Sequence, residues 1–559
     1  MEEIDTIIIG SGAAGLSAAI CLSRAGQRVL VLEQHDVPGG WCHSFYLNGH
    51  RFSPGVHYIG LMDEGESTSD LYKGLGIAND LVFFRMNPNG YEHCWIGNER
   101  IDMPADANLL YESLSKRFPS EQKGLKSYLQ LVKKVSDEIQ LIPKMKTFWD
   151  HLSIPFRTRH MGKYGLFTLK RVIDWYIKDP LLKAVLNVQC GDHGLPPGKA
   201  SFPVHCVVMN HYFKGGFYPM GGGAAIVKAM TKAIHKYGGE VRTRQTVKRI
   251  LVEGDSKLKA VGVELANGEM IKAKRVLSNA DPAKTFELLG IQNQSKKLQN
   301  RIAKTRYSVT SLFLFLTVDM DLRDAGLDSG NIWKLQHEDL EKLYQEMTLK
   351  DLLQGEEFPA CFISCPTLKD PVSYNGRYHT IEVVTFIDYH SFSEFKQSTN
   401  YKSEEYLKHK KLITEKLLNS VEKVIPEIRK HIVQMELGTP LTSEYYINAT
   451  NGSAYGTEKT FNQIGPFSYS FQTEIEDLYL CGASTLAHGV AGASNSGVQA
   501  AAKILGCNAD DLIKPIEGQQ VRIYDAEDNS KWSQWIFDKM KDKKRRFKEI
   551  SKPTMLQTS

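Results

Sequence analysis

The first 33 residues hold the pattern that most constrains the fold of this chain. Residues 4–9 read IDTIII, a continuous apolar run typical of a buried parallel strand. GSGAAG follows, then LSAAICLSRAG, a helix ending at Gly26, and then RVLVLE, a second strand ending at Glu33. Strand, glycine-rich turn, helix and strand in this order predict a βαβ unit that binds a dinucleotide.

Each part of this unit has a separate task in nucleotide binding. Gly10 permits the tight turn, Gly12 lets the backbone approach a pyrophosphate, and Gly15 lets the helix pack on the strand. Free N–H groups at the helix start attract phosphates, and Glu33 falls where a carboxylate binds ribose hydroxyls. The alternative is a glycine turn without a nucleotide. We expect cofactor contacts from Gly10, Ser11, Gly12, Ala13, Ala14, Gly15, Glu33 and Gln34.

A second glycine pair, Gly39-Gly40, distinguishes between possible dinucleotides. It follows Glu33 after six residues, in a loop after the second strand. Bare backbone there suits the ribityl-phosphate of FAD, whereas an enzyme that binds only NAD has no such need. The sequence therefore predicts FAD as the cofactor.

Three later segments agree with an FAD-binding domain. Residues 238–250 resemble a strand pair that covers the adenine, with Val247 in contact, and 273–282 resemble a strand that returns to the sheet near Ala280. Residues 478–505 read as a strand, a small-residue loop and a helix whose start can face the flavin and stabilise its negative charge. The alternative for this helix is ordinary packing of small residues. The expected contacts here are Gly482, Ala483, Gly492 and Ala493.

The predicted fold class is α/β, with a Rossmann-like FAD-binding domain assembled from separated segments and a mixed α+β substrate domain with a helical, membrane-facing insertion. The FAD-binding segments are 1–105, 216–305 and 436–507. The substrate domain takes 106–215 and 306–435, helical at about 130–200. A basic amphipathic tail covers 508–559.

Three blocks carry a family resemblance: GGWCHSFYLNGHRFSPGVHYIG, ASFPVHCVVMNHYFKGGFYPMGGG and GTPLTSEYYINATNGSAYG. They resemble the retinol saturase and carotenoid isomerase branch of the phytoene desaturase superfamily, over about residues 4–507. The resemblance implies bound FAD, a tunnel for a polyene and peripheral attachment to membranes. The chain departs from retinol saturases at Ala483, where an acidic residue is expected, at Trp41, where a cysteine is expected, and in lacking a secretory leader.

The implied reaction is saturation of one C=C bond by a hydride from reduced flavin N5 and a proton from an acid. Carotenoid cis–trans isomerisation, polyene desaturation and a lipid-carrying flavoprotein without turnover are the alternatives. The proton donor must be titratable and lie near the flavin. We rank Tyr58 first, then His57, then His211, although each histidine could instead be a hydrogen-bonded structural residue. His43, His205 and His488 are further candidates.

Composition limits the partners. The net charge of +5 over 559 residues gives no nucleic-acid footprint, and the nine cysteines form no CxxC pair, so we expect reduced thiols and no metal. The chain shows no second complete GxGxxG unit, which predicts an external electron donor. No signal peptide or long apolar span is present in the sequence, so we expect a cytoplasmic protein.

Two basic, aromatic-rich stretches predict contact with a membrane surface. Residues 143–177 interleave seven Lys and Arg with Phe148, Trp149, Phe156, Phe167 and Trp175. Residues 530–550 carry eight basic residues, with Trp532, Trp535, Ile536 and Met540 at helical spacing on one face. In both cases the alternative is a helix whose apolar face packs on the protein itself.

Overall fold

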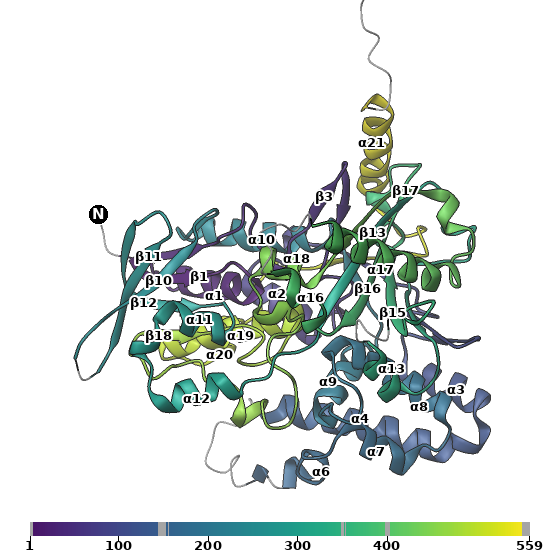
Figure 1. The fold of residues 1–559 in the computed structure, drawn as a ribbon, viewed down its shortest axis with the longest axis horizontal. Coiled ribbons are helices and arrows are strands. Elements are labelled where there is room, and N and C mark those ends of the chain that lie inside the picture. The colour runs from purple at the N-terminus through teal and green to yellow at the C-terminus, as the bar shows by residue number, and fades with distance from the viewer. Residues whose placement is uncertain are drawn as a thin grey trace, which may run out of the picture.

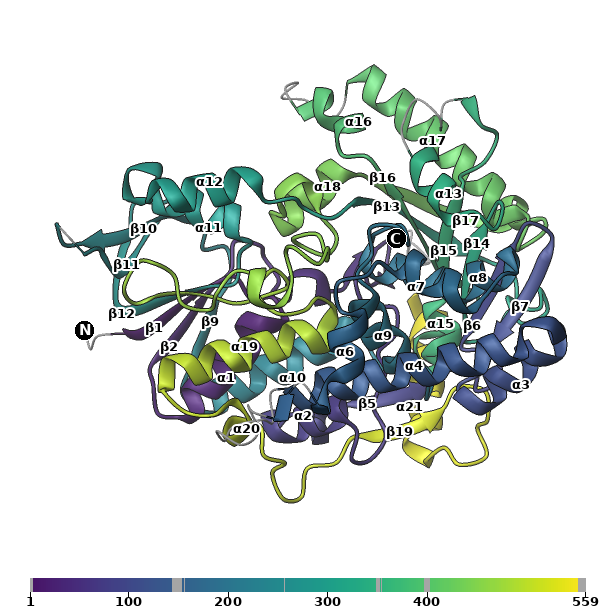
Figure 2. The same ribbon diagram turned by 90° about the horizontal axis from the view of Figure 1, so that it is seen from below.

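The computed structural model describes residues 4–550 except 143–152, 155, 256, 348–351, 353 and 397–402. Figure 1 shows two lobes, one built around the sheet that contains β1 and the other around the sheet that contains β13. Figure 2, seen from below, shows a layer of helices from residues 107–211 lying across the second lobe.

The first sheet has the order β10-β11-β12-β1-β2-β9, with β18 paired to β12. Its strands β9, β2, β1, β12 and β18 run parallel, and β10, β11 and β12 form an antiparallel extension. The bounds are β1 Ile4–Ile9, β2 Val29–Leu32, β9 Glu240–Arg242, β10 Val247–Glu253, β11 Lys259–Leu265, β12 Met270–Ser278 and β18 Leu478–Leu480. The βαβ unit and the returning strands are where the sequence predicts them.

Helix α1 (Ala13–Arg24) lies at the centre of this lobe. Every residue from Ala13 to Ser23 is buried, because α10 (Gly223–Lys236) and α19 (Gly489–Leu505) both pack on it. Small residues allow the helices to approach closely: a Cβ on Gly497 of α19 would lie 2.0 Å from the carbonyl oxygen of Ala14. The α1–α19 contact therefore joins the start of the chain to residues almost 500 positions later.

The second sheet has the order β17-β13-β16-β15-β14-β6-β7. Its central strand β13 (TSLFLFLTV) is buried along its whole length, as expected for an apolar strand covered on both faces. The bounds are β6 Glu92–Ile96, β7 Glu99–Met103, β13 Thr310–Val318, β14 Asn331–Leu335, β15 Ala360–Ser364, β16 His379–Ile387 and β17 Ile432–Gly438. Helix α17 (Glu404–Glu422) packs on one face and the helical layer on the other.

Two of the predicted segment boundaries differ from this pairing. Strands β6 and β7 lie before residue 105 but belong to the second sheet, because β6 pairs in parallel with β14. Strand β17 pairs with β13, so residues 436–438 also belong to the second sheet. Both pairings join distant parts of the chain, so the local sequence pattern does not predict them.

The helical layer contains α3, α4 and α6–α9. Helix α4 contacts α3, α6, α7 and α9, and its buried side chains join a core with β6, β14, β15 and β16. Phe148 and Trp149, which we expected at a membrane, lie outside the described residues. The bounds are α3 Ala107–Arg117, α4 Gln122–Leu141, α6 Arg159–Tyr164, α7 Leu169–Tyr176, α8 Pro180–Asn187 and α9 Phe202–His211.

The C-terminal segment is part of the body. Strand β19 (Arg522–Asp525) pairs in parallel with β5 (Val82–Arg85), and β8 (Phe217–Pro219) completes this small sheet. Helix α21 (Gln534–Ile550) buries Ile536 completely against Phe84 and Ala526. Of the two interpretations of this helix, packing on the protein itself therefore describes Ile536. Our expectation that Ile536 faces a membrane is wrong.

Candidate functional site

One cavity of about 1610 Å³ extends from the first sheet to the helical layer of the second lobe. The ends of β1, β2 and β12 open into it, together with the starts of α1 and α19. Fifteen of the sixteen predicted cofactor residues line it: Gly10, Ser11, Gly12, Ala13, Ala14, Glu33, Gln34, Gly39, Gly40, Val247, Ala280, Gly482, Ala483, Gly492 and Ala493. Gly15 does not line it; its Cβ would lie 2.3 Å from the Gly10 carbonyl oxygen, so it serves helix packing.

The nucleotide end of the cavity has bare backbone on two sides. A Cβ on Gly12 would lie 2.7 Å from Asn279 Nδ2, and one on Gly40 would lie 3.2 Å from the Gly12 Cα. Gly40 also has φ +53°, a region that favours glycine. Side chains at either position would fill the channel between the glycine-rich turn and the glycine pair.

Both helix starts offer N–H groups without side-chain caps. The residues before α1 and α19, Gly12 and His488, make no capping hydrogen bond through a side chain. Glu33 is held at the end of β2 because its Oε2 accepts from the backbone N (3.0 Å) and hydroxyl (2.5 Å) of Ser11. A carboxylate, two positive helix ends and glycine backbone suit a dinucleotide, so these residues fit FAD.

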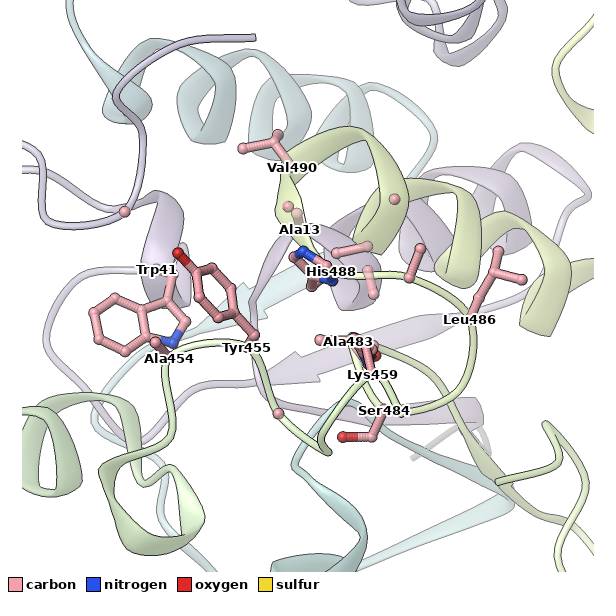
Figure 3. A pocket seen from close by; sticks show the side chains of 18 of the residues that line it. Ala13, Trp41, Ala454, Tyr455, Lys459, Ala483, Ser484, Leu486, His488 and Val490 are labelled. Carbon is pink, nitrogen blue, oxygen red and sulfur yellow. Dashed lines mark hydrogen bonds between the residues drawn. The ribbon is translucent and has the colours of Figure 1, made fainter. Parts of the chain in front are cut away.

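The far end of the cavity is apolar and aromatic. Side chains from α9, β14, β15, β16 and the segment around residue 344 surround it. Its lining includes Val204, Val207, Tyr212, Trp333, Leu343, Tyr344, Met347, Phe362, Val384 and Phe386. Figure 3 shows Trp41, Tyr455 and His488 bordering the cavity from three separate segments. This end suits a long hydrophobic ligand.

Tyr58 lies in the cavity wall, and its hydroxyl forms hydrogen bonds with two carboxyl groups. Its ring stacks on Tyr212 at 4.1 Å between centroids, and its hydroxyl lies 2.6 Å from Glu92 Oε1 and 2.8 Å from Asp192 Oδ2. A phenol has one hydrogen to donate, so the second bond needs a proton on a carboxyl group. Burial raises the pKa of Tyr58 well above its usual value, and the hydroxyl keeps its proton at neutral pH.

Glu92 is fully buried behind Tyr58. Its Oε1 also accepts from Trp333 Nε1 at 3.0 Å, and its Oε2 has no hydrogen-bond partner among the described residues. Burial raises the pKa of Glu92 to about 7, against the opposing effects of its hydrogen bonds and nearby cations. The titratable groups that interact with it include Tyr58, Tyr91, His93, Cys94, Asp192, Tyr212 and Lys369.

The two histidines in our ranking differ in their surroundings. His57 lines the cavity, but its Nδ1 lies 3.1 Å from Glu382 Oε2, and its carbonyl oxygen accepts from buried Lys369. His211 also lines the cavity, and its Nε2 accepts from the Gly60 N–H at 2.9 Å. Burial lowers the pKa of His211 to about 4, which leaves a neutral ring acting as an acceptor. The structure thus brings Tyr58, rather than His211, to a set of acidic groups.

The other candidate histidines make backbone contacts. Nδ1 of His43 lies 2.6 Å from the Gly40 carbonyl oxygen, and Nε2 of His488 lies 2.8 Å from the Asp192 carbonyl oxygen. His205 does not line the cavity. These contacts suit the structural alternative that we weighed for each histidine.

Sequence reasoning missed Glu92, Asp192 and Lys459. Glu92 is the first residue of β6 (EHCWI), directly before buried strand residues, and a carboxylate buried there needs a partner, which is a weak but usable signal. Lys459 lines the cavity and donates to the Ala483 carbonyl oxygen, and burial lowers its pKa to about 7. Nothing local in the sequence distinguishes Lys459 or Asp192 from ordinary loop residues.

A dinucleotide site joined to a deep apolar chamber defines a flavoprotein oxidoreductase. Residues 13–505 match the family described as flavin containing amine oxidoreductase, and the chain belongs to that family. All-trans-retinol 13,14-reductase of Danio rerio is 30% identical, covering 91% of this chain and 87% of the relative. Prolycopene isomerase of Daucus carota is 26% identical, covering 90% of this chain and 80% of the relative.

A solved structure has the same fold. It is a triple mutant of putrescine oxidase, 16% identical, with a TM-score of 0.61 over 90% of this chain and 99% of the other. The α/β flavin amine oxidase-like fold, with a cofactor-binding and a substrate domain, is thereby confirmed. Among the helices of the described residues, none is both long and apolar enough to cross a membrane.

Proposed function

We propose that the protein binds FAD and reduces a C=C bond in a hydrophobic conjugated substrate such as a retinoid or carotenoid. The observation that carries the proposal is the position of Tyr58, which lines the one cavity shared by the nucleotide end and the aromatic end. The names of two relatives, a retinol 13,14-reductase and a prolycopene isomerase, support a polyene substrate.

The residues that fit FAD divide its binding between them. Glu33 would bind ribose hydroxyls, the α1 start would hold the pyrophosphate, and the α19 start would face the flavin. When bound and reduced, FAD supplies a hydride. A protonated Lys459 would stabilise negative charge on the reduced cofactor, because its amine is buried beside Ala483 in the same wall.

Tyr58 supplies the proton in this proposal. Tyr58 lines the cavity, and in this proposal its hydroxyl donates its hydrogen to the second carbon of the double bond. The protonated carboxyl group of Glu92 or Asp192 then passes its proton along the hydrogen bond to the phenolate oxygen, and that carboxyl group regains a proton from solvent before the next cycle. The aromatic lining excludes water and holds the conjugated chain beside Tyr58. Electrons for the next cycle come from an external donor.

The cavity also suggests how a lipophilic substrate enters. Several of its lining residues are exposed apolar side chains, among them Leu166, which is 75% exposed, and Phe467, which is 60% exposed. Phe156 and Trp175, close to Leu166 in the chain, are exposed as well, and exposed Lys170 and Arg171 lie between them. We propose that this face contacts an anionic membrane, with cations above buried rings.

Anaerobic mixing tests the reaction. The FAD-loaded protein is chemically reduced and mixed with all-trans-retinol, a carotenoid or an unsaturated fatty acyl compound. Flavin reoxidation with a product two hydrogens heavier supports the reductase. Geometric change without reoxidation would assign the isomerase alternative, and no response to any polyene would overturn the proposal.

Vesicle flotation tests the membrane face. The wild type is expected to float with vesicles containing anionic lipid, and Leu166→Gln combined with Phe156→Ser is expected to lower the bound fraction. Leu407→Gln is the matched control, because Leu407 is 49% exposed on α17 and does not line the cavity. Equal flotation of all three proteins would refute this face as the docking surface.

A further inference from the structure

Three potential metal ligands meet behind the wall that carries Asp192. Cys190 and His193 belong to the short 3₁₀ segment η5 (Val188–His193), and His205 belongs to α9. Their ligand atoms lie within 4.8 Å of one another. All three are buried, with at most 1% of each residue exposed, and none of them lines the large cavity.

The hydrogen bonds of this cluster are incomplete. His193 has no partner for either ring nitrogen, and Nδ1 of His205 has none, among the described residues. A buried polar group without a partner costs about 1–3 kcal/mol, so two such rings in contact need an explanation. Their ring centroids are 5.8 Å apart with planes at 85°. A shared ligand between the rings supplies that explanation.

His205 is already oriented as a metal ligand. Its Nε2–H donates to the Leu186 carbonyl oxygen at 3.1 Å, so in the neutral ring Nδ1 carries the lone pair and is free to bind a metal ion. Metal-bound histidines usually donate their other ring N–H to a carbonyl or carboxylate in this manner. Burial also lowers the pKa of His205 to about 4 and that of His193 well below its usual value, so both rings are neutral.

We propose that Cys190, His193 and His205 together bind one soft d¹⁰ cation, zinc or cuprous copper. One thiolate and two imidazoles are ligands that both ions accept. Bond lengths of about 2.0–2.3 Å place the donors of one tetrahedral zinc about 3.3–3.8 Å apart. The present separation of up to 4.8 Å therefore closes with a movement of about 1 Å.

Binding is balanced by loss of one proton. The thiol of Cys190 is neutral in the metal-free protein because burial raises its pKa well above its usual value. The cation replaces that proton, which leaves to solvent, and no oxidant or reductant is needed. The sequence spacing, two residues between Cys190 and His193 and eleven more before His205, is the signal that a search for CxxC pairs passes over.

The cation would fasten η5 to α9. Asp192 lies between Cys190 and His193, and its carboxyl is one of the two partners of Tyr58. The cluster is therefore a positioning device for the wall that holds Asp192, and its three residues touch no reacting atom.

Metal analysis of the full-length, FAD-loaded protein tests the proposal. The protein is incubated separately with Zn²⁺ and with Cu⁺ under reducing conditions, then freed of loose metal and analysed by mass spectrometry. About one equivalent of at least one of the two ions is expected to remain bound. Co²⁺ loading is expected to give a thiolate-to-cobalt charge-transfer band.

Variants locate the site. Cys190→Ser and His193→Gln are expected to lower the bound metal at least tenfold, and Cys190→Ser is expected to abolish the cobalt band. Cys206→Ser is the matched control, because Cys206 is buried on α9 next to His205 but stands outside the cluster. A wild type that retains neither ion, or a Cys190→Ser protein that keeps the full equivalent, overturns the proposal even if other variants fail to fold.

Discussion

Replacing Tyr58 with phenylalanine removes one hydroxyl and leaves the rest of the cavity wall in place. The ring keeps its stack on Tyr212 at 4.1 Å. The bonds lost are the 2.6 Å contact to Glu92 and the 2.8 Å contact to Asp192. Glu92 is fully buried, so water does not replace the lost donor there.

The size of both effects follows from these contacts. Loss of one charge-assisted and one neutral hydrogen bond lowers the free energy of unfolding by about 2–4 kcal/mol. Loss of a positioned proton donor slows turnover about 10²–10⁴-fold, which corresponds to about 3–5 kcal/mol in the activation barrier. FAD binding is expected to stay unchanged, since Tyr58 is not among the residues that fit the dinucleotide.

The assay separates binding from chemistry. Flavin content is read from absorbance, and the anaerobic reoxidation rate with a polyene is compared between wild type and Tyr58→Phe. Tyr72→Phe is the control, because Tyr72 is fully buried in the core of the first lobe and its hydroxyl has no partner among the described residues. Formation of the saturated product by Tyr58→Phe at the wild-type rate would exclude Tyr58 as the donor.

Three further results are expected. Gly497→Ala places a Cβ 2.0 Å from the Ala14 carbonyl oxygen. Chemical denaturation should show a free energy of unfolding lower by at least about 2 kcal/mol, and the purified variant should retain less flavin. Gly162→Ala, where a Cβ meets nothing within 4 Å, should be neutral or slightly stabilising; equal losses in the two variants would contradict the close packing. At pH values below 7, where Lys459 is protonated, Lys459→Met should have a lower flavin reduction potential than the wild type, because a buried cation is lost. Anaerobic dye titration measures this potential, and an unchanged value would show that Lys459 does not lie near the flavin. Glu92 has its pKa raised from 4.5 to about 7, so its contribution to stability is complete below pH 4.5 and is lost as pH rises through 7. Denaturation should show that, as pH rises from 4.5 to 7 and above, the free energy of unfolding of the wild type falls by at most about 3 kcal/mol relative to that of Glu92→Gln. Parallel pH curves for the two proteins would refute the raised pKa of Glu92.

The sequence predicted the nucleotide end of the site much better than the reacting end. Gly10, Gly12 and Glu33 line the cavity and belong to a single βαβ unit whose spacing is set by local geometry. Gly39 and Gly40 follow closely for the same reason, so the whole channel could be anticipated. The α19 start also carries its own signal, because small residues at a helix beginning are visible in sequence.

The reacting end depends on pairings between distant segments. Glu92 reaches Tyr58 only because β6 joins the second sheet beside β14, and Asp192 arrives from η5, more than 130 residues after Tyr58. No periodicity or motif in the sequence predicts these contacts between distant segments. The two interpretations of the tail stayed open for a related reason: an amphipathic pattern predicts that a face will be covered but not by what. In the structure, α21 packs Ile536 against Phe84, which is the packing alternative.

The contact between α1 and α19 bears on the order in which the protein matures. A ribosome releases α1 early, yet α19 and β18, which cover α1 and extend the first sheet, are made only after residue 477. Until then α1 has one uncovered face, and the cavity lacks the part of its wall that α19 supplies. We therefore expect FAD to be acquired after synthesis is nearly complete, and nascent chains to need protection from aggregation for most of that time.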